Sequence, residues 1–252
     1  MIAPASTIYL VSGASRGLGR ALVAAYLARP NNTVIATVRD PTSPVSKSLQ
    51  ELSKGTNSSL IVLKTDSLIE TDAQQAIDEL KSVHNITSLD VVIANAGIAK
   101  LFPTVQEVRV EDILEHYRTN VIGVVLLFQA VVPLLKNSTK TPKFVVMGSE
   151  AGSIGGMEQV PVPNAAYGPS KAALNWITKK IHVENPDIIA FPIHPGFVQT
   201  DTGNASARAF GMEKAILTYE ESIPPMVKLI DEATREATSG KFKLYDGSSL
   251  DW

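Results

Sequence analysis

The strongest constraint on the fold of this 252-residue chain is an alternation of short apolar runs with stretches of helical spacing. The apolar runs are rich in β-branched residues and almost continuous, which is typical of strands covered on both faces. They cover residues 7–13, 33–38, 60–66, 89–97, 143–149, 187–196 and 241–246. We therefore expect an α/β fold, residues 1–252 forming one doubly wound domain with about seven parallel strands and helices on both faces.

Between these runs, apolar residues recur at the spacing of helices that pack on a sheet. The helical stretches are residues 18–30, 71–83, 110–137 and 167–181. One segment, roughly residues 199–222, shows neither pattern. Long irregular segments in compact domains are frequently functional, so we expect a substrate-binding loop or lid there.

Composition excludes several classes of protein. The formal net charge is −2, so the chain lacks the basic surface of a nucleic-acid-binding protein. The absence of cysteine excludes a disulfide scaffold and a thiolate metal site, and it fits a reducing compartment, which we take to be the cytoplasm. The histidines show no metal-ligand spacing, so we expect no metal.

No segment predicts export or membrane insertion. The N-terminal sequence MIAPASTIYLVSG lacks the basic start and long apolar core of a signal peptide. The longest apolar run, Val121–Leu135, is shorter than the ~20 residues of a membrane span and contains Gln129 and Pro133. We interpret it as a buried helix and expect neither a membrane nor a nucleic acid as partner.

Glycines gather where the first strand leads into the first helix, in SGASRGLGRAL. Gly13, Gly17 and Gly19 have the spacing G-x-x-x-G-x-G. A backbone that turns sharply out of a strand and presents N–H groups at a helix N-terminus can bind a phosphate, and side chains at these glycines would block the approach. The junction therefore predicts a nucleotide-binding loop of the Rossmann kind. Its expected contacts are Gly13, Ser15, Arg16, Gly17, Leu18 and Gly19.

The end of the second strand indicates which nucleotide is bound. A carboxylate there accepts from the adenosine ribose, whereas an arginine suits a 2′-phosphate. Val38 stands where we expect the acid and Arg39 follows it, while Arg16 can reach the same space. Two guanidinium groups favour NADPH over NADH. Asp40 comes one residue too late for the ribose, and the alternative is that Arg39 and Asp40 only pair on the surface.

Polar and small residues also follow the third and fourth strands. Asp66 and Ser67 end the third run, where the Asp66 carboxylate could accept from an adenine amino group. Asn95, Ala96 and Gly97 end the fourth run and leave room for a flat ligand. Each could be a simple turn, but all lie at the same edge of the expected sheet, which favours one cofactor site.

The stretch AAYGPSKAAL places Tyr167 four residues before Lys171. Residues i and i+4 share a helix face, and Pro169 is tolerated in a first turn. Taken alone, the pair is more readily explained as a surface contact on an amphipathic helix. An ammonium ~4 Å from the phenol, at an effective dielectric of ~20, is worth on the order of 4 kcal/mol. We therefore expect Lys171 to lower the pKa of Tyr167 by roughly two to three units, before burial opposes the change.

Six motifs come in a characteristic order. They are Ser12-Gly13-x-x-x-Gly17-x-Gly19, Asn95-Ala96-Gly97, Asn120, Ser149, Tyr167-x-x-x-Lys171 and Pro195-Gly196. In this order and spacing they resemble the short-chain dehydrogenase/reductases over essentially the whole chain. Longer stretches, among them VSGASRGLGRALVAAYLARP, ETDAQQAIDEL and DGSSLDW, are similar to the fungal norsolorinic acid ketoreductases. The resemblance implies an NADPH-dependent reductase of a small carbonyl substrate, such as an aryl or polycyclic ketone.

The resemblance also implies roles for four residues. Tyr167 would protonate the carbonyl oxygen as general acid, and Lys171 would hold the nicotinamide ribose as well as act on the phenol. Ser149 would hold the carbonyl oxygen or the developing alkoxide; Ser153 is a rival by residue type but lies past the strand end. Asn120 would bend its helix and hold a water that joins Lys171 to solvent. The alternative for Asn120, a buried and satisfied core amide, is compatible with this role.

The residues after the sixth strand complete the expected cofactor site. Pro195 and Gly196 shape a turn, and Val198 and Thr200 would fix the nicotinamide carboxamide. His194 is a tempting acid or base, but a lone histidine on a buried strand is more often packed scaffold.

Several alternatives stay open at this point. A regulator that binds NADP(H) without chemistry would be free to lose the acid or the lysine, and both are present. An NADP-dependent alcohol dehydrogenase would use the same residues in the oxidative direction. The insert Met157–Asn164 is expected to define the substrate pocket together with residues 199–222. Apolar residues around Val121–Leu135 suit a homodimer or tetramer, and packing on the sheet explains them equally.

Overall fold

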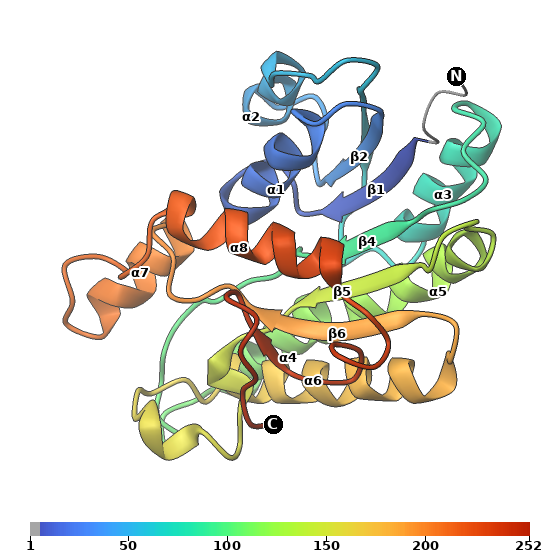
Figure 1. The fold of residues 1–252 in the computed structure, drawn as a ribbon. Helices are drawn as coiled ribbons and strands as arrows, with labels where there is room; N and C mark the ends of the chain where they lie inside the picture. The colour runs from blue at the N-terminus through green and yellow to red at the C-terminus, as the bar shows by residue number, and fades with distance from the viewer. Residues whose placement is uncertain (1–5) are drawn as a thin grey trace.

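The computed structural model describes residues 6–252, so the first five residues of the N-terminal sequence considered above lie outside the described part. Its centre is a seven-stranded sheet with the order β3-β2-β1-β4-β5-β6-β7, in which all neighbouring strands are parallel (Figure 1). The strands are β1 (Thr7–Ser12), β2 (Asn32–Val38), β3 (Ser59–Lys64), β4 (Val91–Ala94), β5 (Lys143–Met147), β6 (Ile189–His194) and β7 (Lys243–Leu244). The prediction of a doubly wound α/β fold with about seven parallel strands is confirmed.

Helices connect the strands and cover both faces of the sheet. They are α1 (Gly17–Leu27), α2 (Pro44–Lys47), α3 (Asp72–Ser82), α4 (Val110–Tyr117), α5 (Gly123–Lys136), α6 (Tyr167–Glu184), α7 (Asp201–Ala209) and α8 (Tyr219–Glu232). Short 3₁₀ turns lie at Ser48–Glu51, Glu150–Gly152 and Met157–Gln159. The helices expected from sequence are all present, and α6 begins at Tyr167 as the spacing of AAYGPSKAAL suggests.

Two apolar cores hold the three layers together. α1 and α8 cover one face of the sheet, and Tyr26 and Ile230 are fully buried there. α3, α5 and α6 cover the other face, where Ile77 is buried. Because successive strand residues point to opposite faces, Leu10 and Val11 of β1 belong to different cores.

The order of the strands creates the edge where the expected site residues lie. The chain leaves β1 toward β2 and β3, and later pairs β4 on the other side of β1. Such a reversal opens a crevice at the carboxyl ends of the neighbouring strands, where open α/β sheets bind ligands. The expected strands 89–97 and 187–196 shorten to Val91–Ala94 and Ile189–His194. The residues that follow each shortened strand form the turns of this edge.

The expectation of an irregular segment at residues 199–222 is wrong in its secondary structure, because the segment contains α7 and the start of α8. At the start of α7 the Thr200 Oγ1 accepts a hydrogen bond from Gly203 N at 2.9 Å, and α8 begins with a capping box between Thr218 and Glu221. The sequence of α7, DTGNASARA, has few large apolar residues and includes a glycine, so neither periodicity nor propensity reveals it.

The apolar helical stretch of residues 110–136 packs as a core helix. Within residues 6–252 it is the one helix long and apolar enough to cross a membrane, but half of its apolar stretch is buried. Its α5 part contributes to the core shared with α3 and α6. Between α4 and α5 the helix widens into a π turn at Arg118–Ile122, which contains Asn120. The helix is therefore irregular at the expected residue.

Candidate active site and cofactor site

The glycine loop leaves β1 in a conformation that excludes side chains. Gly13 and Gly17 have positive φ angles of 66° and 59°. A Cβ atom on Gly13 would lie 2.7 Å from the Cα of Ala96, and one on Gly19 would lie 2.5 Å from the oxygen of Gly13. The loop therefore presents bare backbone at the start of α1, as close approach of a phosphate requires.

Gly13→Ala is expected to weaken NADPH binding more than about tenfold, because a methyl group there must push the loop away from Ala96 and alanine disfavours the positive φ. Gly211 offers a matched control, since its φ is 79° but a Cβ would meet no atom within 4 Å. Gly211→Ala should cost about 1–2 kcal/mol of stability and leave NADPH affinity unchanged. Fluorescence titration of NADPH together with thermal melts measures both effects, and equal losses of affinity in the two variants would contradict this account of the loop.

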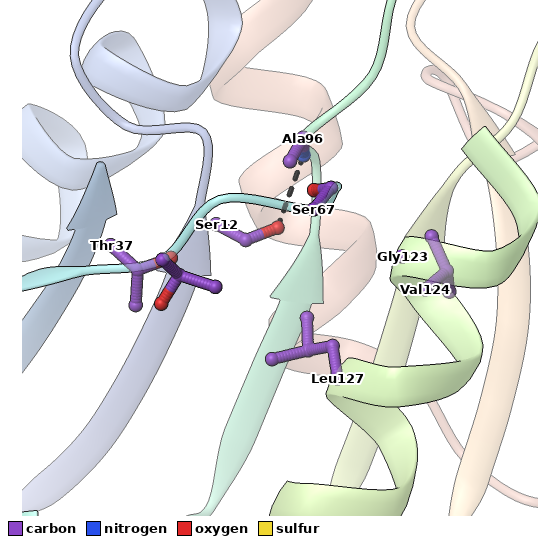
Figure 2. A pocket seen from close by; sticks show the side chains of 8 residues that line it. Ser12, Thr37, Ser67, Ala96, Gly123, Val124 and Leu127 are labelled. Carbon is purple, nitrogen blue, oxygen red and sulfur yellow. Dashed lines mark hydrogen bonds between the residues drawn. The ribbon is translucent and has the colours of Figure 1, made fainter. Parts of the chain in front are cut away.

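Ser12, the last residue of β1, fastens the glycine loop to the turn after β4. Its Oγ accepts hydrogen bonds from the N–H groups of Asn95 and Ala96, each at 3.0 Å, and Figure 2 draws the bond to Ala96. The Asn95 side chain donates to the oxygens of Ser12 at 2.9 Å and Gly13 at 3.2 Å. Asn95 and Ala96 therefore shape the loop. The sequence analysis gave Ser12 no role of its own. Its position directly before Gly13 could have indicated that it contacts the glycine loop.

A small cavity of about 10 Å³ lies beside this clamp. Figure 2 shows its lining side chains, which come from the ends of neighbouring strands and from the start of α5. Thr37 lines the cavity, and its Oγ1 is buried without a hydrogen-bond partner in the described part of the chain. The cavity has the size and polarity for one water molecule and is too small for a nucleotide. A larger hollow of about 750 Å³ lies beside the starts of β5 and β6 and contains none of the expected site residues.

Arg39, the residue expected at a 2′-phosphate, is exposed directly after β2. Asp40 does not pair with it in residues 6–252. Instead, the Asp40 carboxylate accepts from the N–H and the Oγ1 of Thr42 at 2.8 and 2.6 Å, and these hydrogen bonds lower the pKa of Asp40. The alternative of a surface pair between Arg39 and Asp40 is therefore wrong, and the guanidinium faces solvent.

The start of α7 faces the glycine loop. A Cβ atom on Gly17 would lie 3.9 Å from the Cγ2 of Thr200. Arg16 forms an ion pair with Asp201 at 3.3 Å, with both side chains largely exposed. An exposed pair of this kind is weak and breaks readily, so Arg16 remains available to a phosphate.

Asp66 and Ser67 lie in the turn after β3. The Asp66 Oδ1 accepts from the N–H of Leu68 at 3.0 Å, so this oxygen shapes the turn itself. Ser67 packs on the start of α5, where a Cβ atom on Gly123 would lie 2.6 Å from the Cβ of Ser67. The structure places both residues at the same edge as the glycine loop, and their contacts with an adenine stay a prediction.

Tyr167 and Lys171 lie one turn apart at the start of α6, with Pro169 in the first turn as predicted. The Nζ of Lys171 lies 5.7 Å from the centroid of the Tyr167 ring. It donates a hydrogen bond to the oxygen of Met147, the last residue of β5, at 2.7 Å. The helix start thus brings the phenol and the ammonium together at the end of a central strand.

The expected effect of Lys171 on the phenol is wrong for the protein as described. Burial raises the pKa of Tyr167, and the Ser149 side chain only partly opposes this rise. Burial also lowers the pKa of Lys171 to about 8. The ammonium lies over the ring and donates to Met147, so it does not contact the phenol oxygen, and desolvation dominates. The phenol therefore stays protonated at neutral pH, which is the form that can donate a proton.

Ser149 follows β5 and reaches the phenol of Tyr167. The Ser149 side chain acts on the phenol to lower its pKa, and the N–H of Ala151 donates to the Ser149 Oγ at 3.3 Å. Ser153, the rival by residue type, instead donates to the main-chain oxygen of Asp251 at 2.7 Å. The structure therefore brings Ser149 to Tyr167 and uses Ser153 to hold the C-terminal segment.

Asn120 is fully buried, and its side-chain amide is satisfied. Its Oδ1 accepts from the N–H of Ile98 at 2.8 Å, and its Nδ2 donates to Ile98 O at 2.9 Å and to Ser170 Oγ at 3.0 Å. Ser170 in turn donates to the main-chain oxygen of Tyr167 at 2.7 Å. Asn120 thus ties the turn after β4 to the first turn of α6, as the core-amide interpretation predicts. A water held by this residue stays a prediction.

Sequence reasoning overlooked His116, a fully buried residue of α4. Its ring lies edge-on to the Tyr167 ring, with the centroids 6.2 Å apart. Its Nε2 accepts from the N–H of Lys100 at 3.0 Å, so Nδ1 carries the proton and donates to Asp112 O at 2.6 Å. His116 therefore holds the turn after β4 beside Tyr167. Its position one helical turn before Asn120 was the available signal.

The turn after β6 is fixed by contacts with α8 and with the link before it. The main-chain oxygen of Pro195 accepts from Ser222 Oγ at 2.6 Å. Gly196 has a φ of 80°, and a Cβ atom there would lie 2.4 Å from the Cδ1 of Leu217. Val198 is buried and forms a parallel bridge with Leu217. These residues lie at the edge expected for the nicotinamide, and their contacts with it stay a prediction.

His194 precedes this turn and is mostly buried. Its Nε2 lies 3.6 Å from a carboxylate oxygen of Glu150. Burial, together with the charge of Lys171, lowers the pKa of His194 to about 4, so the ring is neutral at pH 7. A neutral, mostly buried ring agrees with the expectation that His194 is a structural residue. Within residues 6–252, no group of three histidine or carboxylate side chains could hold a metal ion.

Comparison with known proteins identifies the family. A model of the short-chain dehydrogenases matches residues 7–209, which is most of the chain. The protein belongs to the short-chain dehydrogenase family. Among the curated relatives of this dehydrogenase, the norsolorinic acid ketoreductase of Dothistroma septosporum is 45% identical over 249 residues, covering 98% of this chain and 92% of the relative. The norsolorinic acid ketoreductase of Aspergillus parasiticus is 41% identical over 251 residues, covering 99% and 92%.

Solved structures agree with this assignment. The NADPH-bound carbonyl reductase from chicken fatty liver is 28% identical, with a TM-score of 0.85 over 98% of this chain and 100% of that one. The carbonyl reductase Sniffer of D. melanogaster is 30% identical, with a TM-score of 0.84 and the same coverage. The short-chain dehydrogenase described here is therefore an oxidoreductase with ketoreductase relatives, and the predicted family and enzyme class are confirmed.

Proposed function

We propose that this short-chain dehydrogenase reduces a ketone to the alcohol with NADPH. The observation that carries the proposal is the convergence of Ser149, Tyr167 and Lys171 at the carboxyl end of β5. The serine side chain acts on the pKa of the phenol, and the ammonium lies over the phenol ring. A protonated phenol beside a hydroxyl donor and a cation can place a proton on a carbonyl oxygen as negative charge develops there.

The edge of the sheet fits a phosphorylated dinucleotide. The backbone at Gly13 and Gly17 leaves open the space that a Cβ atom would restrict, and exposed Arg39 and Arg16 supply positive charge for a 2′-phosphate. When bound, NADPH supplies the hydride for the carbonyl carbon. The residues proposed to hold its adenosine side are Gly13, Ser15, Arg16, Gly17, Leu18, Gly19, Arg39, Asp66, Ser67, Asn95, Ala96 and Gly97. Those proposed for its nicotinamide side are Tyr167, Lys171, Pro195, Gly196, Val198 and Thr200.

The side chains of the protein handle the proton. The Ser149 hydroxyl donates a hydrogen bond to the carbonyl oxygen and holds it beside the phenol. Tyr167, which burial keeps protonated, transfers its proton to that oxygen. Lys171 has a pKa of about 8 and is mostly charged at pH 7, so its ammonium supplies positive charge beside the place where the carbonyl oxygen becomes negative. Asn120 positions the helix start that carries Tyr167, through Ser170.

We further propose an aryl or polycyclic ketone as substrate. The support is the identity of 41–45% with two ketoreductases named for norsolorinic acid, over nearly the full chain. The cytoplasm is the proposed compartment. A homodimer or tetramer is proposed through α4 and the helix that follows it, where Val110, Leu114 and Ile122 are exposed apolar residues.

The reaction is tested by incubating the purified protein with NADPH and a panel of aryl ketones, quinones and aliphatic ketones. We expect the absorbance of NADPH to fall, and the amount of NADPH oxidised to equal the amount of alcohol formed. Tight binding of NADPH without its oxidation by any member of the panel would instead support a sensor that performs no chemistry.

Arg39→Asp is expected to shift the ratio of kcat/KM for NADPH to that for NADH about 10- to 100-fold toward NADH. The substitution removes a charge-assisted contact with the 2′-phosphate and supplies a carboxylate for the ribose hydroxyls. Lys81→Asp, an equal change of charge at the exposed end of α3, serves as the control and should leave the ratio unchanged. An unaltered ratio in the Arg39 variant would remove Arg39 from the phosphate site.

A further inference from the structure

An aromatic pair links the turn after β4 to the end of α7. The rings of Phe102 and Phe210 lie edge to face, with centroids 4.8 Å apart and an interplanar angle of 66°. Both side chains are half-buried, and neither belongs to the two cores of the described structure. We propose that Phe102 and Phe210 form an aromatic wall that recognises the aryl part of the ketone. The proposal rests on the proposed function and names the residues that set its substrate class.

Phe102 lies in a turn that the catalytic region holds in place. On the α4 side, Ile98 is held through both its N–H and its oxygen by Asn120, and the N–H of Lys100 is held by the ring of His116. These bonds involve the same buried side chains that contact Tyr167 or its helix. The backbone that leads to Phe102 is therefore fixed in the absence of substrate.

The other end of the turn is attached beside the proposed acid itself. The main-chain oxygen of Pro103 accepts from the N–H of Ala165, two residues before Tyr167, at 3.1 Å. Between the two attachments Leu101 has a φ of 55°, an unfavourable value for a leucine, and its side chain is 55% exposed. Strain of this kind persists where the surroundings impose it, and it concentrates at binding sites. The contacts at the two ends of the turn therefore hold Leu101 and Phe102 in a strained backbone conformation.

Phe210 reaches Phe102 from the end of α7, which lies in the segment 199–222 that is expected to bind substrate. It ends α7, and its N–H donates to Ser206 O at 3.0 Å and Ala207 O at 3.1 Å. Figure 1 shows α7 beyond the end of the sheet, near the segment that runs from β4 to α4. The two phenylalanines thus come from the two segments that border the proposed site.

The chemistry of the pair favours a flat aromatic ligand. An edge-to-face pair offers both ring faces and ring edges, and aromatic groups interact with these more strongly than saturated groups of the same size. Leucine keeps most of the apolar volume of phenylalanine and removes the ring. Phe102→Leu and Phe210→Leu therefore separate recognition of an aromatic group from simple hydrophobic contact.

The test compares acetylnaphthalene with acetyldecalin, two ketones of the same skeleton that differ in aromaticity. For the wild type with NADPH we expect a higher kcat/KM with acetylnaphthalene. In Phe102→Leu and in Phe210→Leu this preference should fall about three- to tenfold, while NADPH affinity stays constant. Trp176→Leu, which removes an exposed aromatic ring from the outer side of α6, should leave the preference unchanged.

A binding measurement keeps this proposal separate from the proposed reaction. Calorimetric titration of acetylnaphthalene into the protein saturated with NADP⁺ should show affinity that weakens in both leucine variants. If the wild type binds the aryl ketone in this way but never reduces it, the aromatic wall stands and the proposed reaction fails. The aromatic wall would be overturned if neither leucine variant changed the preference for acetylnaphthalene or the affinity for it. It would also be overturned if the wild type reduced other ketones but neither bound nor reduced acetylnaphthalene.

Discussion

Tyr167→Phe is expected to bind NADPH as tightly as the wild type and to lose about 100- to 10,000-fold in kcat/KM, the range that general acid catalysis contributes. The substitution removes one oxygen from a ring that packs on His116 and lies under Lys171. The ring itself remains, so helix α6 and the cofactor edge should keep their structure. Steady-state kinetics with an aryl ketone and a fluorescence titration of NADPH measure the two quantities.

A second tyrosine provides the control for this experiment. The Tyr117 hydroxyl on α4 also contacts the first turn of α6, where it donates to the oxygen of Pro169 at 3.4 Å. Ser149 acts on the pKa of Tyr167 instead. Tyr117→Phe should retain activity within about twofold, because one exposed hydrogen bond contributes little. A Tyr167 variant that kept a tenth or more of the wild-type rate would show that the acid is another group.

Lys171→Met is expected to reduce kcat/KM about 100- to 1,000-fold, the usual effect of removing one group that stabilises developing charge. The variant keeps a side chain of similar length and loses only the ammonium. In the wild type, the reductive rate should fall as pH rises through about 8, because Lys171 then loses its proton. The rate of the variant should not show this decrease above pH 8. If both proteins lost activity at the same alkaline pH, the decrease would come from a group other than Lys171.

The same lysine makes a prediction about stability. The pKa of Lys171 is about 8 in the folded protein, below the ordinary value of 10.5 that it has in the unfolded chain. Between these values the unfolded chain binds more protons than the folded one, so stability rises with pH across the window and is lost as pH falls through 8. Relative to Lys171→Met, the wild type should gain about 2 kcal/mol in the free energy of unfolding from pH 7 to pH 10. Urea unfolding of both proteins at the two pH values measures this difference, and a constant difference would contradict the buried, destabilised ammonium.

The fold was largely predictable because strand and helix periodicity are strong in this chain. The almost continuous apolar runs indicated a sheet covered on both faces, and the seven strands appear in the expected places. Helix α7 could not be predicted in this way, since small and polar residues form it and a cap by Thr200 begins it. Asn204 within the helix holds the segment that follows, by accepting from the N–H of Ala215. Caps act through particular hydrogen bonds, which hydrophobic periodicity does not report.

Much of the candidate site could also be located from the sequence, because strand ends gather at one edge of a parallel sheet. The spacing of Tyr167 and Lys171 correctly predicted their proximity. It did not predict the direction of the pKa change, which depends on burial and on the donation from Lys171 to Met147. His116 and Ser12 were missed because their roles arise from partners distant in the chain. Such pairings become visible only when the fold brings the segments together.

The central claim, that this chain delivers a hydride and a proton to the two ends of a carbonyl group, is tested most directly by isotope transfer. NADPH carrying deuterium at the transferable position is mixed with the wild-type protein and an aryl ketone under single-turnover conditions, and the product is examined by NMR. The account predicts one deuterium on the carbinol carbon for each NADPH consumed, with formation of the alcohol slowed at least about 100-fold in Tyr167→Phe. Deuterium-free alcohol, or labelled alcohol formed equally fast by both proteins, would contradict it.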